Sequence, residues 1–285
     1  MSDGTMDDLV LRDLDGDGVL TLTLNRPERR NAWTPALEDA YFTALDEAAT
    51  DGAVRVIVLT GAGRAFCPGV DAERLSALAG RPLDLTGRRP HHHPWSVPKP
   101  MVAAINGACA GVGLIQALLC DVRFVARGAR LATSFARRGL PAERGISWLL
   151  PRLIGVENAL DLLLSGRTVT ADEALRLGLA SRVADSGELL SAAQEYARDL
   201  ARNCSPRSMA VIRHQVLADL DTGFGAAFDR SLAAMERFAG QPDFVEGVAS
   251  FLERRAPAFE ALPKDFEALP RNHDSAATAT RDGGA

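Results

Sequence analysis

The sequence predicts an α/β fold in which helices cover both faces of a sheet. Strand and helix patterns alternate over the first two thirds of the chain, and two runs, VRVIVLT at residues 54–60 and MVAAI at residues 101–105, are almost wholly apolar. Strands of this kind need apolar cover on both faces. Helical patterns dominate after Gly155. With 285 residues, 47% hydrophobic and 24% charged, the chain can bury such a core.

Residues 9–24 predict a β-hairpin, because two β-type runs flank a turn rich in Gly and Asp. The letters DLDGDG in this turn resemble the start of a calcium-binding loop, but the twelfth position is Leu24, where such a loop needs a glutamate. We therefore interpret the segment as a hairpin turn. Thr34 and Pro35 are typical of a helix start, and the apolar spacing that follows predicts a helix up to Asp51.

Helices are also predicted over the last third of the chain. Residues 156–164 have helical spacing, the letters TADE at 170–173 form a capping box, and Ser-Pro at 205–206 begins another helix. One helix carries an apolar stripe, which we interpret as core of the same chain rather than a subunit contact. The stripe consists of Phe228, Leu232, Met235 and Phe238. The small, polar residues beyond Leu262 predict a disordered tail.

Composition excludes several classes of partner. The net charge of −5 and the scattered basic residues argue against nucleic-acid binding. The four cysteines form no C-x-x-C pair, so we expect reduced, mostly buried thiols and no metal site. The first residues lack the pattern of a signal peptide, and no apolar run is long enough to span a bilayer. These features predict a cytoplasmic protein without a membrane partner.

Two Gly-rich turns offer the strongest signal of a binding site. Residues 61–71 (GAGRAFCPGVD) and 106–113 (NGACAGVG) each follow a predicted strand and precede a predicted helix. Such turns let the backbone approach a ligand, and together they can direct two peptide N–H groups at one oxygen, as in an oxyanion hole. Neither turn has the full pattern of a dinucleotide or Walker phosphate site. Tight turns without a ligand remain the alternative.

A series of motifs resembles the crotonase family of enoyl-CoA hydratases and isomerases. The motifs run in the family's order over residues 9–259: NRPERRNAWT, LTGAGRAFCPGVD, KPMVAAINGACAGVGLIQALLCDVRFVA, GISWLLPRLIG, LLLSGRTVTADEALRLGLASRV and ASFLERRAPAF. The resemblance implies a crotonase-like spiral of β-β-α units over residues 9–200 and a helical trimerisation region over 201–262, before the tail at 263–285. It also implies an acyl-CoA thioester substrate, a homo-trimer or hexamer, and no cofactor beyond the substrate's own coenzyme A.

The resemblance also assigns an oxyanion hole. Its donors are the backbone N–H groups of Val70, after Gly69, and Val112, after Gly111. Hydrogen bonds to a thioester oxygen strengthen as an enolate develops, so they favour the transition state.

The candidate acid/base is Glu143. Hydratases of this family carry two glutamates at places where this chain has Ile115 and Phe135, which argues against ordinary hydration. Glu143, in GLPAERG, occupies the place where the isomerase-like branch carries a single acid. A lone carboxylate can remove a proton from one carbon and return it two carbons away, so we expect double-bond isomerisation. The alternative for Glu143 is a solvated loop residue paired with Arg144.

Other candidates have weaker support. Asp71 is interpreted as a helix N-cap rather than a catalytic group. The three histidines of RRPHHHPW are interpreted as a lid or surface loop rather than a metal site, because adjacent side chains point apart. The resemblance places the phosphates of coenzyme A beside Arg29 and Arg30, which precede Asn31 and Ala32, and beside Arg254 and Arg255 of the same or an adjacent subunit.

Three alternatives to isomerisation remain open at this stage. The enzyme could hydrate enoyl-CoA with other residues, or Glu143 could attack a carbon as a nucleophile in a dehalogenase or hydrolase reaction. The third alternative is a catalytically silent protein whose apolar pocket binds acyl-CoA.

Overall fold

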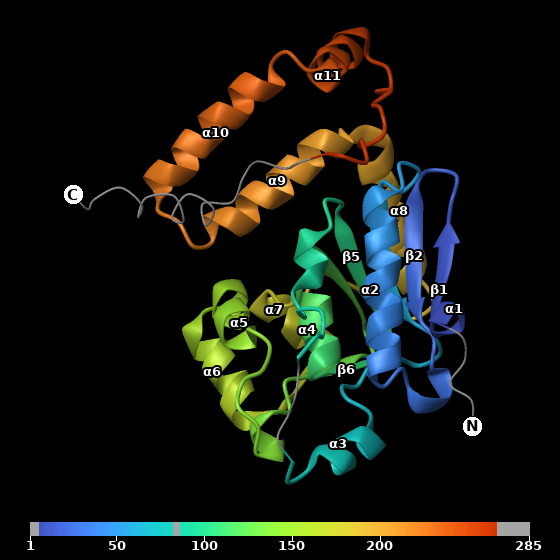
Figure 1. Cartoon of the computed structure of the whole chain (residues 1–285), viewed down its shortest axis with the longest axis vertical. Helices are drawn as coiled ribbons and strands as arrows, with labels where there is room; N and C mark the ends of the chain where they lie inside the picture. Colours follow the sequence, from blue (N-terminus) through green and yellow to red (C-terminus); the bar gives the residue numbers. More distant parts are fainter. Residues whose placement is uncertain (1–5, 82–85, 267–285) are drawn as a thin grey trace, which may run out of the picture.

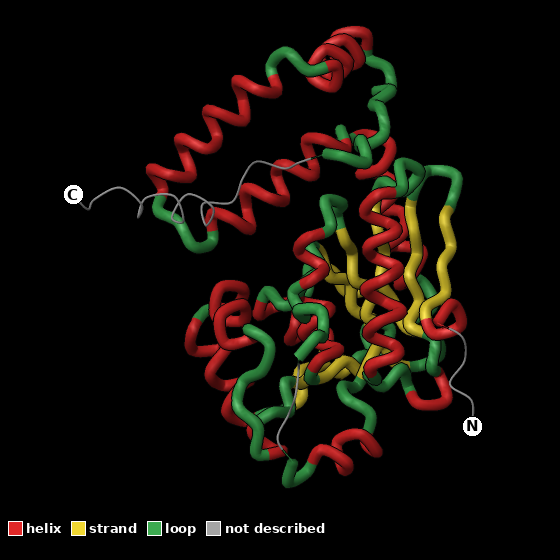
Figure 2. The backbone as a smooth tube through the Cα atoms, viewed as in Figure 1, coloured by secondary structure: helices red, strands yellow, loops and turns green. Residues whose placement is uncertain are grey.

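The computed structural model describes residues 6–81 and 86–266, and its strands form two sheets (Figures 1 and 2). The larger sheet has the order β1-β2-β3-β5-β7-β10, and the smaller sheet has the order β4-β6-β8-β9. β1 and β2 form the predicted antiparallel hairpin, and the other pairs of the larger sheet are parallel. The strands are β1 Val10–Leu14, β2 Val19–Leu24, β3 Val56–Gly61, β4 Ala65–Cys67, β5 Met101–Ile105, β6 Ala108–Ala110, β7 Val122–Ala126, β8 Arg130–Ala132, β9 Thr168–Thr170 and β10 Arg182–Ala184.

Helices cover both faces of the larger sheet, as predicted. α2 packs against β1 and β2, whereas α8 packs against β2, β3, β5 and β7 (Figure 1). Every residue of β3 and β5 is buried, which explains their uninterrupted apolar sequences. The α-helices are α1 Met6–Leu9, α2 Pro35–Thr50, α3 Ala72–Leu78, α4 Val112–Leu118, α5 Ile146–Ile154, α6 Val156–Ser165, α7 Ala171–Leu177, α8 Leu189–Asn203, α9 Pro206–Asp219, α10 Phe224–Phe238 and α11 Pro242–Glu253.

Local side-chain hydrogen bonds explain where several elements begin. The Thr34 hydroxyl accepts from the amide of Leu37 at the start of α2, as Ser205 does from Ser208 at the start of α9. In the hairpin turn, the Asp15 carboxylate accepts from two backbone amides of its own turn and from Arg198 of α8. The aspartates of this turn thus stabilise the hairpin and its contact with α8.

A β-β-α unit repeats along the chain. β3, β4 and α3 form one unit, and β5, β6 and α4 form the next, with the first strand in the larger sheet and the second in the smaller. This arrangement confirms the predicted crotonase-like spiral. The short strands β4 and β6 were missed, because they lie inside the Gly-rich turns and pair with each other over only a few residues. Such short strands leave no periodic pattern.

Gly113 lets α4 pack directly on β4. A Cβ atom at this position would lie 2.2 Å from the carbonyl oxygen of Cys67 and 2.7 Å from the Cys67 Cβ. Because the nearest atom belongs to the backbone, rotation of a side chain cannot relieve the clash. The absence of a side chain at Gly113 therefore sets the spacing between the first two β-β-α units.

We expect Gly113→Ala to lower the free energy of unfolding by about 2 kcal/mol or more, because overpacking of a close backbone contact strains the core. The matched control is Gly225→Ala in α10, where an added Cβ would meet nothing within 4 Å. In that helix the substitution should stabilise by about 0.5–1 kcal/mol through helix propensity. Urea denaturation measures both, and equal stability of the two variants would contradict the expected clash.

The last three helices extend away from the two sheets (Figure 1). α10 has α9 as its principal neighbour, so the stripe predicted as core of the same chain faces outward. The exposed fractions are 50% for Phe228, 44% for Leu232 and 67% for Met235. The core interpretation of this stripe was therefore wrong. The predicted disordered tail lies mostly outside the described residues, although Leu262 is buried.

The cysteines are free thiols, and most are buried, as predicted. Cys67 of β4, Cys109 of β6 and Cys120 after α4 are fully enclosed by the core, whereas Cys204 is half-buried. Burial raises the pKa of Cys67 and of Cys120 to about 12, and it also raises the pKa of Cys109 well above the ordinary value of a thiol. Among the described helices, none has both the length and the apolarity needed to cross a membrane.

Candidate active site

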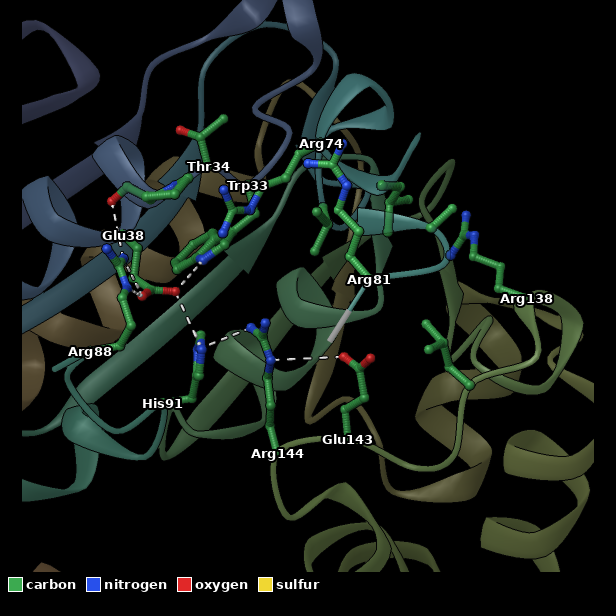
Figure 3. Close-up of a pocket in the computed structure, with 15 residues that line it drawn as sticks. Trp33, Thr34, Glu38, Arg74, Arg81, Arg88, His91, Arg138, Glu143 and Arg144 are labelled. Atoms are coloured by element: carbon green, nitrogen blue, oxygen red, sulfur yellow. Dashed lines mark hydrogen bonds and ion pairs between the residues drawn. The ribbon is translucent and has the colours of Figure 1, made fainter. Parts of the chain in front are cut away.

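A cavity of about 360 Å³ lies between the start of α2, α3 and the loops that precede β5 and α5 (Figure 3). Two of the three predicted catalytic residues, Val70 and Glu143, line it. Its apolar lining includes Trp33, Leu75 and Leu140. The fold thus places a candidate amide donor and a candidate acid/base at one cavity with room for an acyl chain.

The two Gly-rich turns lie in contact with each other. Gly69 has a φ of 110° and Gly111 a φ of 52°, both in the left-handed region that favours glycine. A Cβ added to Gly69 would lie 3.3 Å from the carbonyl oxygen of Ala110. Val112 is the first residue of α4, so its N–H has no partner within the helix. Neither the amide of Val70 nor that of Val112 donates to another described residue.

The side chains of Val112, Ile115 and Phe135 belong to the core and do not line the cavity. Their exposed fractions are 2%, 1% and 4%. The places where the resemblance puts the hydratase glutamates thus hold buried apolar groups. The Val112 side chain packs inward, and no residue of the second Gly-rich turn is among those that line the cavity.

Glu143 faces the cavity in a loop whose backbone is unusual. The next residue, Arg144, has a φ of 53°, a left-handed conformation that is uncommon for a residue with a side chain. The Nε atom of Arg144 lies 3.8 Å from a carboxylate oxygen of Glu143, which is longer than a hydrogen bond. The Glu143 side chain is 26% exposed, and its carboxylate accepts no hydrogen bond from the described residues. Both oxygens therefore remain available for proton transfer.

A buried polar network holds Arg144 in place (Figure 3). Arg144 Nη1 donates to Nδ1 of His91 at 3.1 Å, because a guanidinium can only donate. The proton of a neutral His91 must then lie on Nε2, which is 3.4 Å from Glu38. The Glu38 carboxylate also accepts from Trp33 Nε1 at 2.8 Å and from Arg88 Nε at 3.0 Å. Four side chains thus fix the guanidinium beside Glu143.

Electrostatics keep this network in one protonation state. The pKa of His91 is lowered to about 4, and burial is the largest cause. The positive charge of Arg144 also lowers this pKa, by more than the negative charge of Glu38 raises it. Burial of Glu38 opposes ionisation, but the hydrogen bonds from Trp33 and Arg88 outweigh it, so the pKa of Glu38 is lowered. At neutral pH the network therefore contains a neutral imidazole between a carboxylate and a guanidinium.

We expect the free energy of unfolding to decrease as the pH falls from 7 to 5, and we expect protonation of His91 in the unfolded chain to cause part of this decrease. The folded-state pKa of about 4 lies below the ordinary value of 6.5, so the unfolded chain binds a proton in this window that the folded chain does not. After allowance for solvent screening, the loss should be about 1 kcal/mol. Urea unfolding at both pH values should show a smaller loss in His91→Gln than in the parent protein. His92→Gln, at an exposed neighbouring position, is the control. An unchanged pH dependence in His91→Gln would contradict the assignment.

The other predicted site residues lie outside the cavity lining. Asp71 caps α3 by accepting from the Glu73 amide, as predicted, and Arg29 pairs with Glu73 at 3.0 Å. Arg30 and Ala32 lie in the loop before α2, which a β-bridge between Trp33 and Val70 joins to the first Gly-rich turn. Arg254 ends α11 and Arg255 binds Glu246, so this chain does not bring them to its own cavity.

Sequence reasoning missed several residues of the cavity. It interpreted the histidine loop as a lid or surface loop, which the resemblance places near the acyl pocket, but it selected none of the histidines. The His91 side chain is only 12% exposed and lines the cavity, while His93 contacts Asp46 instead. It also passed over Glu38, whose side chain is 6% exposed. A signal was available, because Glu38 precedes Tyr41 and Phe42 by three and four residues and so shares their buried face of α2.

Comparison with known proteins defines the class to which this fold and cavity belong. The family model described as enoyl-CoA hydratase/isomerase matches residues 15–262. The chain therefore belongs to the enoyl-CoA hydratase/isomerase family of the crotonase superfamily, a family of enzymes.

Some relatives are named isomerases and others are named hydratases. The chain is 37% identical over 197 residues to the 1,2-epoxyphenylacetyl-CoA isomerase of Escherichia coli K12, which covers 65% of this chain and 73% of that protein. It is 35% identical over 243 residues to the enoyl-CoA hydratase ACTT3 of Alternaria alternata. This match covers 83% of this chain and 81% of that protein.

Solved structures of enoyl-CoA hydratases are similar to this chain over most of its length. That of a Polaromonas sp. JS666 enzyme has a TM-score of 0.82 at 30% identity and covers 88% of this chain and 99% of the other. The structure of the enoyl-CoA hydratase EchA12_1 from Mycobacterium marinum has a TM-score of 0.66 at 50% identity. It covers 75% of this chain and 100% of the other.

Proposed function

We propose that the protein is an enoyl-CoA isomerase in which Glu143 is the single acid/base and the amides of Val70 and Val112 form the oxyanion hole. The observation that carries the proposal is the cavity lining. Glu143 and Val70 share one cavity, whereas the two places of the hydratase glutamates hold the buried side chains of Ile115 and Phe135.

In the proposed reaction, a 3-enoyl thioester binds with its carbonyl oxygen at the two amides. The Glu143 carboxylate removes a proton from C2, and the electron pair moves onto the thioester oxygen as a dienolate. The amides stabilise this charge, since their hydrogen bonds strengthen as it develops. The protonated Glu143 then delivers the proton to C4, which leaves the double bond between C2 and C3. No metal or organic cofactor enters this scheme, and coenzyme A is part of the substrate.

Hydration is the second candidate, because the cavity contains another carboxylate, Glu38. Adding water across a double bond usually requires one group to orient the water and another to deliver a proton. Both oxygens of Glu38 are already engaged by Trp33, Arg88 and His91, so Glu38 is less available than Glu143. This occupancy favours isomerisation over hydration.

The test uses purified protein with 3-enoyl and 2-enoyl thioesters in deuterated water, followed by mass spectrometry. Isomerisation predicts interconversion of the double-bond position, with deuterium at C2 or C4 in those turnovers in which the proton on Glu143 exchanges with solvent. A product heavier by one water would establish hydration, and a covalently modified Glu143 peptide under single turnover would establish nucleophilic attack. Tight binding without deuterium uptake or turnover, unchanged by Glu143→Gln, would leave only an acyl-CoA-binding role.

We further propose that the exposed apolar faces of α10 and α11 are subunit contacts in a homo-trimer or hexamer. Large exposed apolar patches mark interaction surfaces. Phe228 and Met235 of α10 and Phe251 of α11 are each at least half exposed. Light scattering coupled to size-exclusion chromatography should give three or six times the chain mass of 30.4 kDa. A mass of one chain would contradict the proposal.

A further inference from the structure

We infer that the acyl group accepted by this cavity carries a negative charge beyond the thioester, such as a terminal carboxylate, and that Arg74, Arg81 and Arg138 recognise it. The inference rests on the proposed function in one respect, since it takes the cavity beside Glu143 as the acyl pocket. It goes further by naming a class of substrate, the CoA thioesters of dicarboxylic acids.

The charge of the cavity is the first observation. Five arginines and two glutamates line it, so its wall has an excess of three positive charges, with His91 neutral. The whole chain, by contrast, has a net charge of −5. A concave, partly apolar site with this excess raises the local concentration of anions. A neutral fatty acyl chain would gain nothing from this excess of charge.

The pairing of these arginines is the second observation. Two of the five are already neutralised by protein groups, since Arg88 pairs with Glu38 and Asp39, and Arg144 lies between His91 and Glu143. The side chains of Arg74, Arg81 and Arg138 make no ion pair or hydrogen bond with any described residue. Their guanidinium groups are therefore free for a ligand, and the planar fork of arginine matches a carboxylate.

Their position in the cavity is the third observation. Arg74 lies in α3, Arg81 follows it, and Arg138 ends the 3-10 helix at Ala136–Arg138. In Figure 3, Arg81 and Arg138 lie across the cavity from Arg88 and His91. The ligand would thus reach the free arginines at one side of the cavity while its thioester end lies near Glu143.

The same cavity also suits a carbon chain. Trp33, Leu75 and Leu140 line it together with the arginines, so an aliphatic segment and a terminal anion can be held at once. The phosphates of coenzyme A offer another anion for these arginines. The resemblance, however, assigns the phosphates to Arg29 and Arg30, which do not line this cavity. We therefore favour the acyl carboxylate, and the experiment below separates the two sources.

The experiment compares the binding of adipoyl-CoA with that of its neutral terminal monoamide by isothermal titration calorimetry. The two thioesters have nearly the same shape and lack a reactive double bond, so the result does not depend on turnover. We expect adipoyl-CoA to bind at least about 10-fold more tightly, as charge-assisted hydrogen bonds predict. The double variant Arg74→Gln, Arg138→Gln should lose this preference. Arg176→Gln, an exposed arginine of α7 outside the cavity, should retain it.

Thioesters of phosphate-free pantetheine distinguish the two anions. If the arginines recognise the acyl carboxylate, the preference for the adipoyl compound persists without the phosphates. Equal affinity of the parent protein for the acid and the amide would overturn the inference, whether or not the variants fold. An equal loss of affinity for both CoA thioesters in the double variant would assign these arginines to the phosphates instead and also overturn it. Absence of double-bond migration in enoyl thioesters would refute isomerisation but leave the binding result intact.

Discussion

Glu143→Gln should lower kcat/KM for a 3-enoyl-CoA by about 10³-fold, because general acid–base groups contribute about 10² to 10⁴ in rate. The amide has nearly the shape of the carboxylate but accepts no proton at neutral pH. KM should change little, since the substrate is held mainly by its coenzyme A, its chain and the oxyanion hole. Steady-state kinetics with a coupled assay for the 2-enoyl product measures both parameters.

The matched control for this variant is Glu157→Gln, an exposed glutamate in the first turn of α6. It should leave kcat/KM within about twofold, since surface substitutions away from a site have small effects. Glu143→Asp should recover part of the lost rate, because a carboxylate returns at a slightly greater distance. A loss of less than about 10-fold in Glu143→Gln would remove Glu143 from the proposed mechanism.

Arg213→Met should lower the free energy of unfolding by about 2–3 kcal/mol, because it leaves buried carbonyl oxygens without their donor and removes the ion-pair partner of the partly exposed Asp121. Arg213 of α9 donates from Nε to both carboxylate oxygens of Asp121, at 2.8 and 3.0 Å. Its Nη atoms donate to the carbonyl oxygens of Pro94, Trp95 and Val97. With an exposed fraction of 7%, the side chain leaves these acceptors little access to water once it is gone.

Arg202→Met provides the comparison for Arg213. Arg202 also forms an ion pair, with Asp17 at 2.7 Å, but its side chain is 52% exposed. Exposed pairs contribute little to stability because water screens them, so this variant should differ little from the parent protein. Denaturant titration followed by tryptophan fluorescence measures both. Similar losses in the two variants would contradict the claim that the Arg213 contact anchors α9 to the body of the protein.

Those parts of the fold that repeat or alternate were predictable from the sequence. The hairpin, the buried strand at residues 101–105 and the helix starts at Thr34 and Ser205 follow from local periodicity and capping, and the structure confirms them. Strands β4 and β6 were not predictable, because three-residue strands are defined by their pairing. The stripe on α10 has the spacing of a core helix, but spacing alone does not distinguish core from an exposed apolar face.

The candidate site was predictable to the extent that it depends on short motifs. Val70 and Glu143 were selected from two segments, and the structure brings both to one cavity. The contact between Glu38 and His91 was not predicted, because the two residues are 53 positions apart and belong to no common motif. They meet only because the loop that carries His91 packs on α2. The excess of positive charge in the cavity was not predictable either, because it depends on α3 and the loop before α5 lying at the same cavity.

The buried thiols of Cys67 in β4, Cys109 in β6 and Cys120 after α4 can report local opening of the protein core. A cysteine reacts with alkylating reagents only as the thiolate, and a pKa of about 12 leaves almost no thiolate at neutral pH. Cys67 and Cys109 sit on the paired short strands that carry the two Gly-rich turns. Slow labelling of these two residues, read peptide by peptide, would therefore time how often that pair of strands separates in the native enzyme.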